Sequence, residues 1–184
     1  MRPTAFLDRD GTLNREVDFV RSPDELVVLP GARDALQRLR DASWRIVVVT
    51  NQSGVARGYF DERTLAAIHA KLHRELGALP DAYLHCPHHP DGGFGYARAC
   101  ACRKPGAGLL HEAKELLGAD LSCGAVVGDS ARDVLMARDT RLCTVLVRSG
   151  KPIAEQQAKL AAAGATPDFV ADALPDAVDW LLAR

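Results

Sequence analysis

The chain has 184 residues and a formal net charge of -1 at pH 7, with 47% hydrophobic and 26% charged residues. This composition is typical of a globular protein, and the balanced charge argues against a nucleic-acid or membrane surface as the main partner. No apolar run is long enough to span a bilayer, and residues 1–4 lead directly into a strand without the apolar stretch of a signal peptide. We therefore expect a cytoplasmic protein with a single domain over residues 1–184.

The first predicted element is a short buried strand over residues 4–7, which ends at two carboxylates, Asp8 and Asp10. Gly11 and Thr12 mark the point where this strand breaks into a loop. Both carboxylates then lie at the carboxyl end of a strand, where ligands bind in open α/β sheets. Two carboxylates this close favour a divalent cation such as Mg²⁺, while the alternative is an acidic turn paired with Arg9.

Residues 16–20 and 26–29 are too short for core strands and are interpreted as a flap or small hairpin beside this site. Pro30 and Gly31 open a predicted helix whose apolar positions follow helical spacing up to residue 42. A second strand over residues 45–50 ends at Thr50, and a loop over residues 51–58 follows. Asp61 is predicted to cap the next helix, which stops at Gly77.

The rest of the chain alternates between short apolar runs and helical patterns. We predict strands over residues 82–86, 125–128 and 144–147, and helices over residues 107–117, 131–139, 153–163 and 174–182. The Gly, Pro and His content after the first of these strands is typical of an irregular loop. Near-continuous apolar strands alternating with helices predict an α/β fold with a Rossmann-like, mainly parallel sheet and helices on both faces.

Cysteine and histidine gather at the two ends of a loop over residues 86–102. Three thiolates and one imidazole complete a tetrahedral zinc site, which is structural when the protein supplies all four ligands. The candidates are Cys86, Cys100, Cys102 and either His88 or His89. The odd number of cysteines, five, favours reduced thiols or metal ligands over disulfides. The alternative is a set of reduced cysteines with a surface histidine, and spacing does not decide between His88 and His89 as the ligand.

Other histidines and cysteines receive a structural interpretation. His69 and His73 lie four residues apart on a predicted helix, but no third ligand is near them in the sequence, so we interpret them as part of a solvated helix face. Cys123 and Cys143 lie beside or within apolar strands and are interpreted as small buried residues.

Four motifs, each at the end of an apolar run or just before a predicted helix, follow one another in order: Asp8 to Thr12, Thr50, Lys104 beside Pro105, and Asp129 followed by Asp133. This set resembles the haloacid dehalogenase-like superfamily of phosphohydrolases. The resemblance implies that Asp8 is the nucleophile, that Asp10 is the general acid and base, and that Thr50 and Lys104 contact the phosphoryl group. It also implies Mg²⁺ held by Asp8, the Asp10 backbone carbonyl and Asp129, with Asp133 reaching the metal through water or capping a helix. The intervals where this superfamily inserts a cap domain are already filled by predicted elements, so we expect a core without a cap.

Longer stretches of the sequence indicate a particular family within this superfamily. Residues 48–58, 86–90, 100–105 and 147–151 are similar to the corresponding motifs of the heptose bisphosphate phosphatases, a family of this superfamily. This likeness implies a small sugar bisphosphate as substrate and selects His88 as the zinc ligand. The substrate contacts expected from it are Arg57 and Arg103 for the second phosphate, and Glu16, Phe19, Asn51 and Ser53 near the sugar.

One position departs from the family pattern, because Ser130 stands where relatives often carry lysine. We expect a monomer without nucleic-acid or membrane partners. Two alternatives stay open: a histidinol-phosphate phosphatase from the same subfamily, and a non-catalytic zinc module that binds a phosphorylated ligand.

Overall fold

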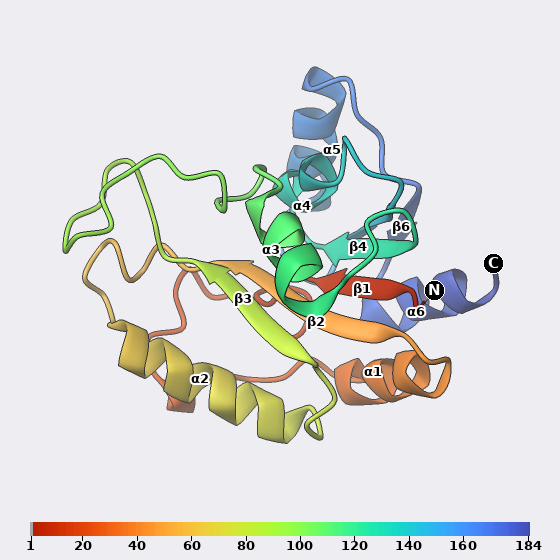
Figure 1. The fold of residues 1–184 in the computed structure, drawn as a ribbon, viewed down its shortest axis with the longest axis horizontal. Helices are drawn as coiled ribbons and strands as arrows, with labels where there is room; N and C mark the ends of the chain where they lie inside the picture. Colours follow the sequence, from red (N-terminus) through yellow and green to blue (C-terminus); the bar gives the residue numbers. More distant parts are fainter. Residues whose placement is uncertain (1) are drawn as a thin grey trace.

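The computed structural model describes residues 2–184 as a six-stranded sheet with helices on both faces (Figure 1). All neighbouring strands are parallel, in the order β3-β2-β1-β4-β5-β6. Their bounds are Thr4–Leu7 for β1, Arg45–Asn51 for β2, Ala82–Cys86 for β3, Gly124–Gly128 for β4, Cys143–Val147 for β5 and Phe169–Ala171 for β6. The parallel α/β fold predicted from the alternation of strands and helices is confirmed.

The helices divide into two layers. Residues of α1, α2 and α6 enter the core on one face of the sheet, and residues of α3, α4 and α5 pack on the other. The bounds are Ala32–Asp41 for α1, Glu62–Glu75 for α2, Gly108–Leu117 for α3, Ala131–Met136 for α4, Ile153–Ala162 for α5 and Leu174–Leu182 for α6. A short 3₁₀ helix, η1, spans Pro23–Glu25.

The central strand β1 shows how the sequence builds both cores. Ala5 and Leu7 point into the core under α1 and α6, while Phe6 points into the core under α3, and all three are fully buried. Successive side chains of a strand alternate between faces, so a strand buried on both sides must be apolar at every position. Residues 5–7 meet this requirement, and the polar member of the strand, Thr4, is buried at its start.

Helix ends follow their capping residues. The Asp61 carboxylate accepts a hydrogen bond from the Thr64 backbone N–H at 2.7 Å, as expected for the cap of α2. At the other end, Gly77 adopts a left-handed conformation with φ of 71°. In α4, Ser130 and Asp133 form a reciprocal capping box.

The structure agrees with the interpretation of residues 16–29 and corrects two other details. Residues 16–29 contain η1 and no strand of the sheet, Val28 forms an isolated antiparallel bridge with Asn14, and Glu16 and Phe19 lie beside Asp8 and Asp10, as expected for a flap. Helix α4 ends at Met136, and the three residues that follow form a turn where helix was predicted. The edge strand β6, only three residues long, was not predicted at all.

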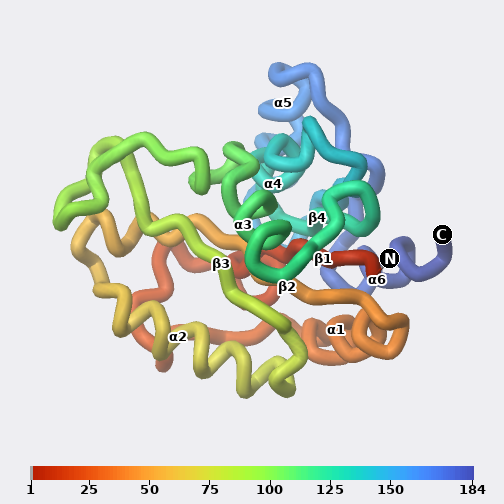
Figure 2. The backbone as a smooth tube through the Cα atoms, viewed as in Figure 1, coloured from red at the N-terminus to blue at the C-terminus, as the bar shows by residue number. Residues whose placement is uncertain are grey.

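Figure 2 shows the loop between β3 and α3 extending away from the sheet beside the segment that joins β2 to α2. The two segments are joined by a backbone hydrogen bond from Gly93 to Ala56 at 2.6 Å. None of the helices in residues 2–184 has the length and apolar character needed to cross a membrane.

Candidate active site

The predicted catalytic residues meet at the carboxyl ends of β1, β2 and β4. They line a cavity of about 230 Å³, to which Asp8, Asp10, Thr50, Lys104 and Asp129 all contribute. Parallel strands bring their carboxyl ends to one edge of the sheet, which explains why residues so far apart in sequence converge. The cavity is also lined by five of the predicted substrate contacts: Glu16, Phe19, Asn51, Ser53 and Arg103. The remaining lining residues are Arg9, Asp18, Gln52, Ser130, Arg132, Asp133 and Lys151.

Lys104 lies between two carboxylates at the bottom of this cavity. Its ammonium group donates to Asp8 Oδ1 at 2.7 Å, to Asp133 Oδ1 at 2.5 Å and to the Val49 carbonyl at 3.0 Å. Burial alone would lower the pKa of Lys104, but the charges of Asp133 and Asp8 raise the pKa above its usual range. The lysine is therefore held as a cation against the carboxylate of Asp8.

The backbone of Lys104 is fixed by Asn51 at the end of β2. The Asn51 side-chain amide donates to the Lys104 carbonyl at 3.1 Å, and its oxygen accepts from the Lys104 N–H at 3.0 Å. Asn51 was expected to meet the sugar, and it does line the cavity. The Asn51 side-chain amide is nevertheless bonded to the Lys104 backbone, so in this structure Asn51 positions Lys104.

Asp8 and Asp129 lie in a buried region that is rich in negative charge. Burial raises the pKa of both carboxyl groups to about 6. A nearby lysine partly offsets this rise, Lys104 for Asp8 and Lys151 for Asp129. The ammonium of Lys151 also pairs with Glu16 at 2.6 Å. The cluster thus holds four carboxylates, Asp8, Asp129, Asp133 and Glu16, against two ammonium groups, which leaves two negative charges without a cation.

The same region has ligand atoms suited to a divalent cation. Carboxylate oxygens of Asp8, Asp129 and Asp133 lie within 4.8 Å of one another. Asp129 Oδ2 accepts from the Lys151 backbone N–H at 2.9 Å, whereas Asp129 Oδ1 is buried without a partner in residues 2–184. An unpaired buried oxygen and two uncompensated charges fit the oxygen-ligand chemistry of Mg²⁺.

Glycine allows the chain to pass close to Asp129. A Cβ atom at Gly11 would lie 2.3 Å from Asp129 Oδ2, and one at Gly150 would lie 2.1 Å from the same oxygen. Gly11 also has φ of 81°, in the left-handed region that favours glycine. The glycine of the first motif is therefore required by both its backbone conformation and its proximity to a carboxylate.

Asp10 has a separate partner, Arg9. The Arg9 Nε and Nη2 atoms face both oxygens of the Asp10 carboxylate, with contacts from 2.9 to 3.2 Å. Asn14 and Gln52 each donate a further hydrogen bond at 2.9 Å, and the Gln52 amide also bonds Thr50 Oγ1. The interpretation of Arg9 as the partner of an acidic turn thus describes Asp10 but not Asp8.

These contacts determine the charge of Asp10. Burial would raise its pKa, but the Arg9 charge and the hydrogen bonds from Asn14, Arg9 and Gln52 outweigh burial and hold the pKa below its usual range. In the free protein Asp10 is thus a carboxylate, the form that can accept a proton. An anion that entered the cavity would favour its protonated form.

The outer part of the cavity is cationic. Arg103 and Arg132 both line it, and burial together with the charge of Arg132 lowers the pKa of Arg103. The Arg132 Nε donates to Ser130 Oγ at 3.5 Å, at the start of α4. Arg57, expected to meet the second phosphate, does not line this cavity as the structure describes it; its guanidinium contacts His89 Nε2 at 3.1 Å.

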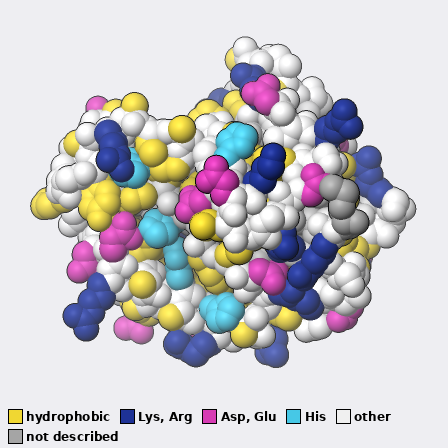
Figure 3. All heavy atoms as spheres, in the orientation of Figure 1, with side chains coloured by type: hydrophobic (Ala, Val, Ile, Leu, Met, Phe, Trp, Pro, Cys, Tyr) yellow, Lys and Arg dark blue, Asp and Glu magenta, His cyan; other side chains and the backbone are white. Residues whose placement is uncertain are grey.

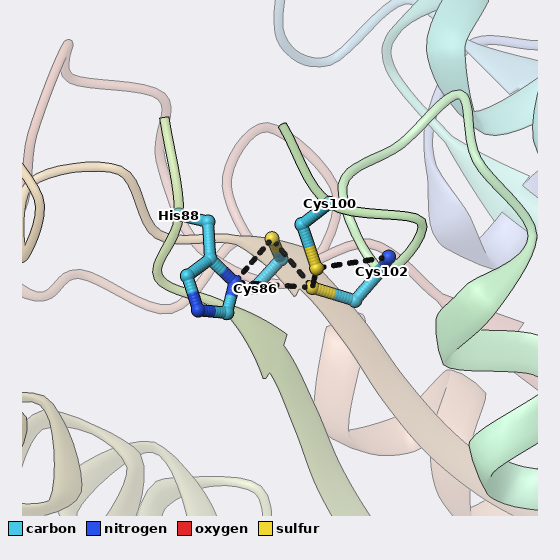
Figure 4. Close-up of side chains that lie close together, drawn as sticks. All are labelled: Cys86, His88, Cys100 and Cys102. Atoms are coloured by element: carbon cyan, nitrogen blue, oxygen red, sulfur yellow. Dashed lines mark hydrogen bonds between the residues drawn. The ribbon is translucent and has the colours of Figure 1, made fainter. Parts of the chain in front are cut away.

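A second cluster lies at the base of the loop between β3 and α3. Figure 4 shows the side chains of Cys86, His88, Cys100 and Cys102 pointing toward one another. The Cys102 Sγ lies 2.7 Å from Cys100 Sγ and 2.8 Å from Cys86 Sγ, and His88 Nδ1 lies 3.4 Å from Cys102 Sγ. Four such donors fit the tetrahedral ligand set of a structural zinc ion.

The two candidate histidine ligands point in different directions. His88 Nδ1 faces the sulfur atoms, whereas His89 Nδ1 accepts from the Asp91 N–H at 3.1 Å and its Nε2 contacts Arg57. Cys102 is followed in the chain by Arg103 and Lys104, so the cluster is covalently joined to the residue that contacts Asp8.

The interpretation of His69 as part of a solvated helix face is wrong. His69 is buried, and its Nε2 atom lies 3.3 Å from Arg9 Nη1. Sequence reasoning also missed Gln52, Arg132 and Lys151. For Gln52 and Lys151 a signal existed, since both belong to motifs used for the family resemblance, but no local pattern marks Arg132.

The chain is similar to known proteins over most of its length. The Hydrolase_like model, of HAD-hydrolase-like proteins, matches residues 101–177. The D-glycero-beta-D-manno-heptose-1,7-bisphosphate 7-phosphatase of Bordetella bronchiseptica is 46% identical over 149 residues, 79% of this chain and 80% of the relative. The enzyme of the same name from Haemophilus ducreyi is 37% identical, with 98% of both chains covered.

A solved structure shows the same fold over nearly the whole chain. The D,D-heptose 1,7-bisphosphate phosphatase of B. bronchiseptica, complexed with magnesium and phosphate, has a TM-score of 0.82 with 41% identity, and 98% of each chain is covered. The protein is thus a phosphoric monoester hydrolase with the haloacid dehalogenase-like fold. Within that class, the chain belongs to the family of heptose 1,7-bisphosphate 7-phosphatases.

Proposed function

We propose that this chain removes the C7 phosphate of D-glycero-D-manno-heptose 1,7-bisphosphate, with Mg²⁺ as cofactor and a phosphorylated Asp8 as intermediate. The observation that carries the proposal is the arrangement around Asp8. Its carboxylate contacts the Lys104 ammonium at 2.7 Å, beside an Asp129 oxygen without a partner in residues 2–184. Arg103 and Arg132, which have no carboxylate partner in the described part of the chain, line the same cavity, which suits a substrate with a second anion.

In the first half-reaction, an Asp8 oxygen forms a bond to phosphorus while the bond from phosphorus to the sugar oxygen breaks. Asp10, protonated once the anionic substrate is bound, gives its proton to the leaving alkoxide. In the second half, the Asp10 carboxylate takes a proton from water as the water oxygen bonds to phosphorus. Phosphate leaves and Asp8 is again a carboxylate.

Thr50 orients the phosphoryl group by a hydrogen bond, and Lys104 offsets its negative charge. Gln52, which bonds both Thr50 and Asp10, fixes the relative position of these two side chains. Asp8 and Asp129, with the Asp10 carbonyl, would hold Mg²⁺. Asp133 would not bind the metal directly and would reach it through water. The cation supplies positive charge to the phosphoryl oxygens.

Cys86, His88, Cys100 and Cys102 would hold Zn²⁺ as a structural ion. Such an ion adds a cross-link to a loop that otherwise has little regular structure. Because Cys102 lies two residues before Lys104, a fixed Cys102 restricts the backbone that carries the lysine.

At the outer end of the cavity, Arg103 would bind the C1 phosphate together with Arg132. Guanidinium groups suit this role because they bind phosphate oxygens in pairs. Glu16, Phe19 and Ser53 line the same cavity and are the proposed sugar contacts. The product, a heptose 1-phosphate, is the form required for activation by a nucleotide, which places the reaction in the synthesis of lipopolysaccharide or related heptose-containing glycans.

The test is phosphate release by the purified chain with Mg²⁺, measured on the α and β anomers of heptose 1,7-bisphosphate and on histidinol phosphate. We expect one heptose anomer to give the highest kcat/KM. Preferred turnover of histidinol phosphate would replace the proposed substrate. Absence of phosphate release from every ester, by protein that still binds them, would identify a non-catalytic phospho-ligand module.

A further inference from the structure

Arg9 is the largest side chain that is fully buried in residues 2–184, with 1% exposure. Two of its three nitrogens, Nε and Nη2, face the Asp10 carboxylate. The third, Nη1, points the opposite way and contacts His69 Nε2 at 3.3 Å. The guanidinium is therefore held at one end by Asp10 and at the other by an imidazole from helix α2.

The chemistry of the two groups defines the contact. A guanidinium has donors and no acceptor, so His69 Nε2 must accept, and the imidazole proton must lie on Nδ1. Burial, with the charge of Arg9, lowers the pKa of His69 to about 3, which keeps the ring neutral and its acceptor lone pair free at neutral pH. The bond is thus present under the conditions of catalysis.

His69 is itself held in place by β3. Its ring stacks on Tyr83 with 5.2 Å between centroids and an angle of 27°, and it meets His85 edge to face at 5.8 Å. His85 in turn bonds Glu62 at 2.9 Å, at the start of α2. These rings border a groove of about 460 Å³ between α2 and β3, and Figure 3 shows histidine side chains exposed over this region.

We infer that His69 is a positioning residue for the phosphatase reaction, which holds Arg9 and thereby sets the orientation of the Asp10 carboxylate. The inference rests on the proposed function, since it assigns Asp10 the proton transfers. Proton transfer needs the carboxyl group within hydrogen-bond reach of the leaving oxygen, and a displaced partner changes that geometry. His69 lies outside the cavity and acts only through Arg9.

The inference makes a specific kinetic prediction. Without an acceptor at position 69, the buried Arg9 Nη1 lacks a partner and the guanidinium can turn away from Asp10. We expect His69→Leu to lower kcat about tenfold or more, because a misplaced Asp10 loses part of the rate enhancement that a general acid supplies. KM should stay within about twofold of the wild-type value. Since Asp10 alone is displaced, the phosphate contacts of Lys104 and the arginines should be kept.

The variants separate positioning from packing. His69→Gln restores an oxygen acceptor at a similar distance from the backbone and should recover most of kcat, although it loses the ring. His73→Leu is the matched control, because His73 lies one turn along α2 and lines the same groove, where it meets the Tyr83 ring edge-on at 5.9 Å. We expect kcat of His73→Leu to equal that of the wild type, and equal losses in both leucine variants would overturn the inference.

A spectroscopic measurement tests the contact without any substrate. In ¹⁵N-edited NMR of the wild-type protein, the His69 ring should give the neutral pattern with the proton on Nδ1, from pH 8 down to about 5. A proton on Nε2, or a charged ring at pH 7, would overturn the inference. Should the wild type fail to release phosphate while the ring shows the Nδ1 pattern, the proposed function fails and the contact to Arg9 stands.

Discussion

The two carboxylates of the first motif have opposite electrostatic surroundings although one residue separates them. Asp8 is paired with Lys104 and keeps a raised pKa of about 6, mainly because it is buried. Asp10 is paired with Arg9 and two amides, and its pKa is lowered. Different environments for two neighbouring acids are the usual way in which an enzyme assigns them different roles, here nucleophile and proton carrier.

Asp8→Asn tests the role of the nucleophile. An amide at this position cannot form the acyl phosphate, so we expect steady-state phosphate release to fall by about 10⁴-fold or more. Mass spectrometry must exclude deamidation back to aspartate. As the control, Asp91→Asn changes a side chain that is 88% exposed, and it should keep full activity. Turnover by intact Asp8→Asn protein near the wild-type rate would rule out Asp8.

Arg132 tests the second phosphate site. Its loss removes a charge-assisted contact worth about 1.5–3 kcal/mol, so Arg132→Ala should raise KM for heptose 1,7-bisphosphate about 10- to 100-fold. With heptose 7-phosphate, which lacks the second anion, the two proteins should have similar KM values. Arg148→Ala is the control, because Arg148 pairs with Asp172 on the surface. An equal effect on both substrates would refute an anion site at Arg132.

The sequence could predict which residues end the strands, since the motifs lie directly in the chain. It could not predict which side chains the fold brings to them. His69 is 60 positions from Arg9, and on its helix it looked like one of two solvated histidines. Only the packing of α2 against β3 decides that His69 turns inward. Arg132 was missed for a similar reason, because an arginine in the first turn of a helix carries no signal of what lies opposite.

Among the elements, those with strong periodicity or caps were predicted closely, as β1 and α6 show. The failures are short or irregular. Strand β6 has three residues and owes its existence to pairing with β5, a non-local contact. Residues 16–29 were expected as a flap beside the site, but the contacts that hold this segment could not be predicted: the bridge of Asn14 to Val28, and Lys71, which donates to the Pro23 and Leu26 carbonyls.

The loop between β3 and α3 makes a prediction at the scale of an element. If a metal ion joins its two ends, Cys100→Ser should lower zinc content and reduce activity about 10- to 100-fold, because the loop leads into Lys104. Cys123→Ser, a free cysteine outside the cluster, should change neither quantity. Elemental analysis should find about one zinc per chain in wild-type protein purified without chelator. Its absence there would contradict the site.

At the scale of the whole molecule, one sheet separates two helical layers and presents its reactive groups along a single edge. Strand β1 lies between β2 and β4 and ends in Asp8, while β4 ends beside Asp129. The register of β1 against β4, which pairs Leu7 with Val127, therefore sets the distance between the two carboxylates. The same strand residues pack the core and carry the site, so the apolar run before Asp8 helps to position that carboxylate.

Leu7 provides the last test, because it is fully buried in the core under α1 and α6. Leu7→Ala removes apolar contacts and leaves a cavity. Because β1 is paired with β2 and β4 on its two sides, the cavity cannot easily collapse, and the free energy of unfolding should fall by about 2–5 kcal/mol. Leu116→Ala makes the same change at a side chain with 66% exposure and should stay within about 0.5 kcal/mol of wild type. Denaturant unfolding of the three proteins measures both values. Similar losses in the two variants would mean that β1 is not the packed centre from which the carboxylates are positioned.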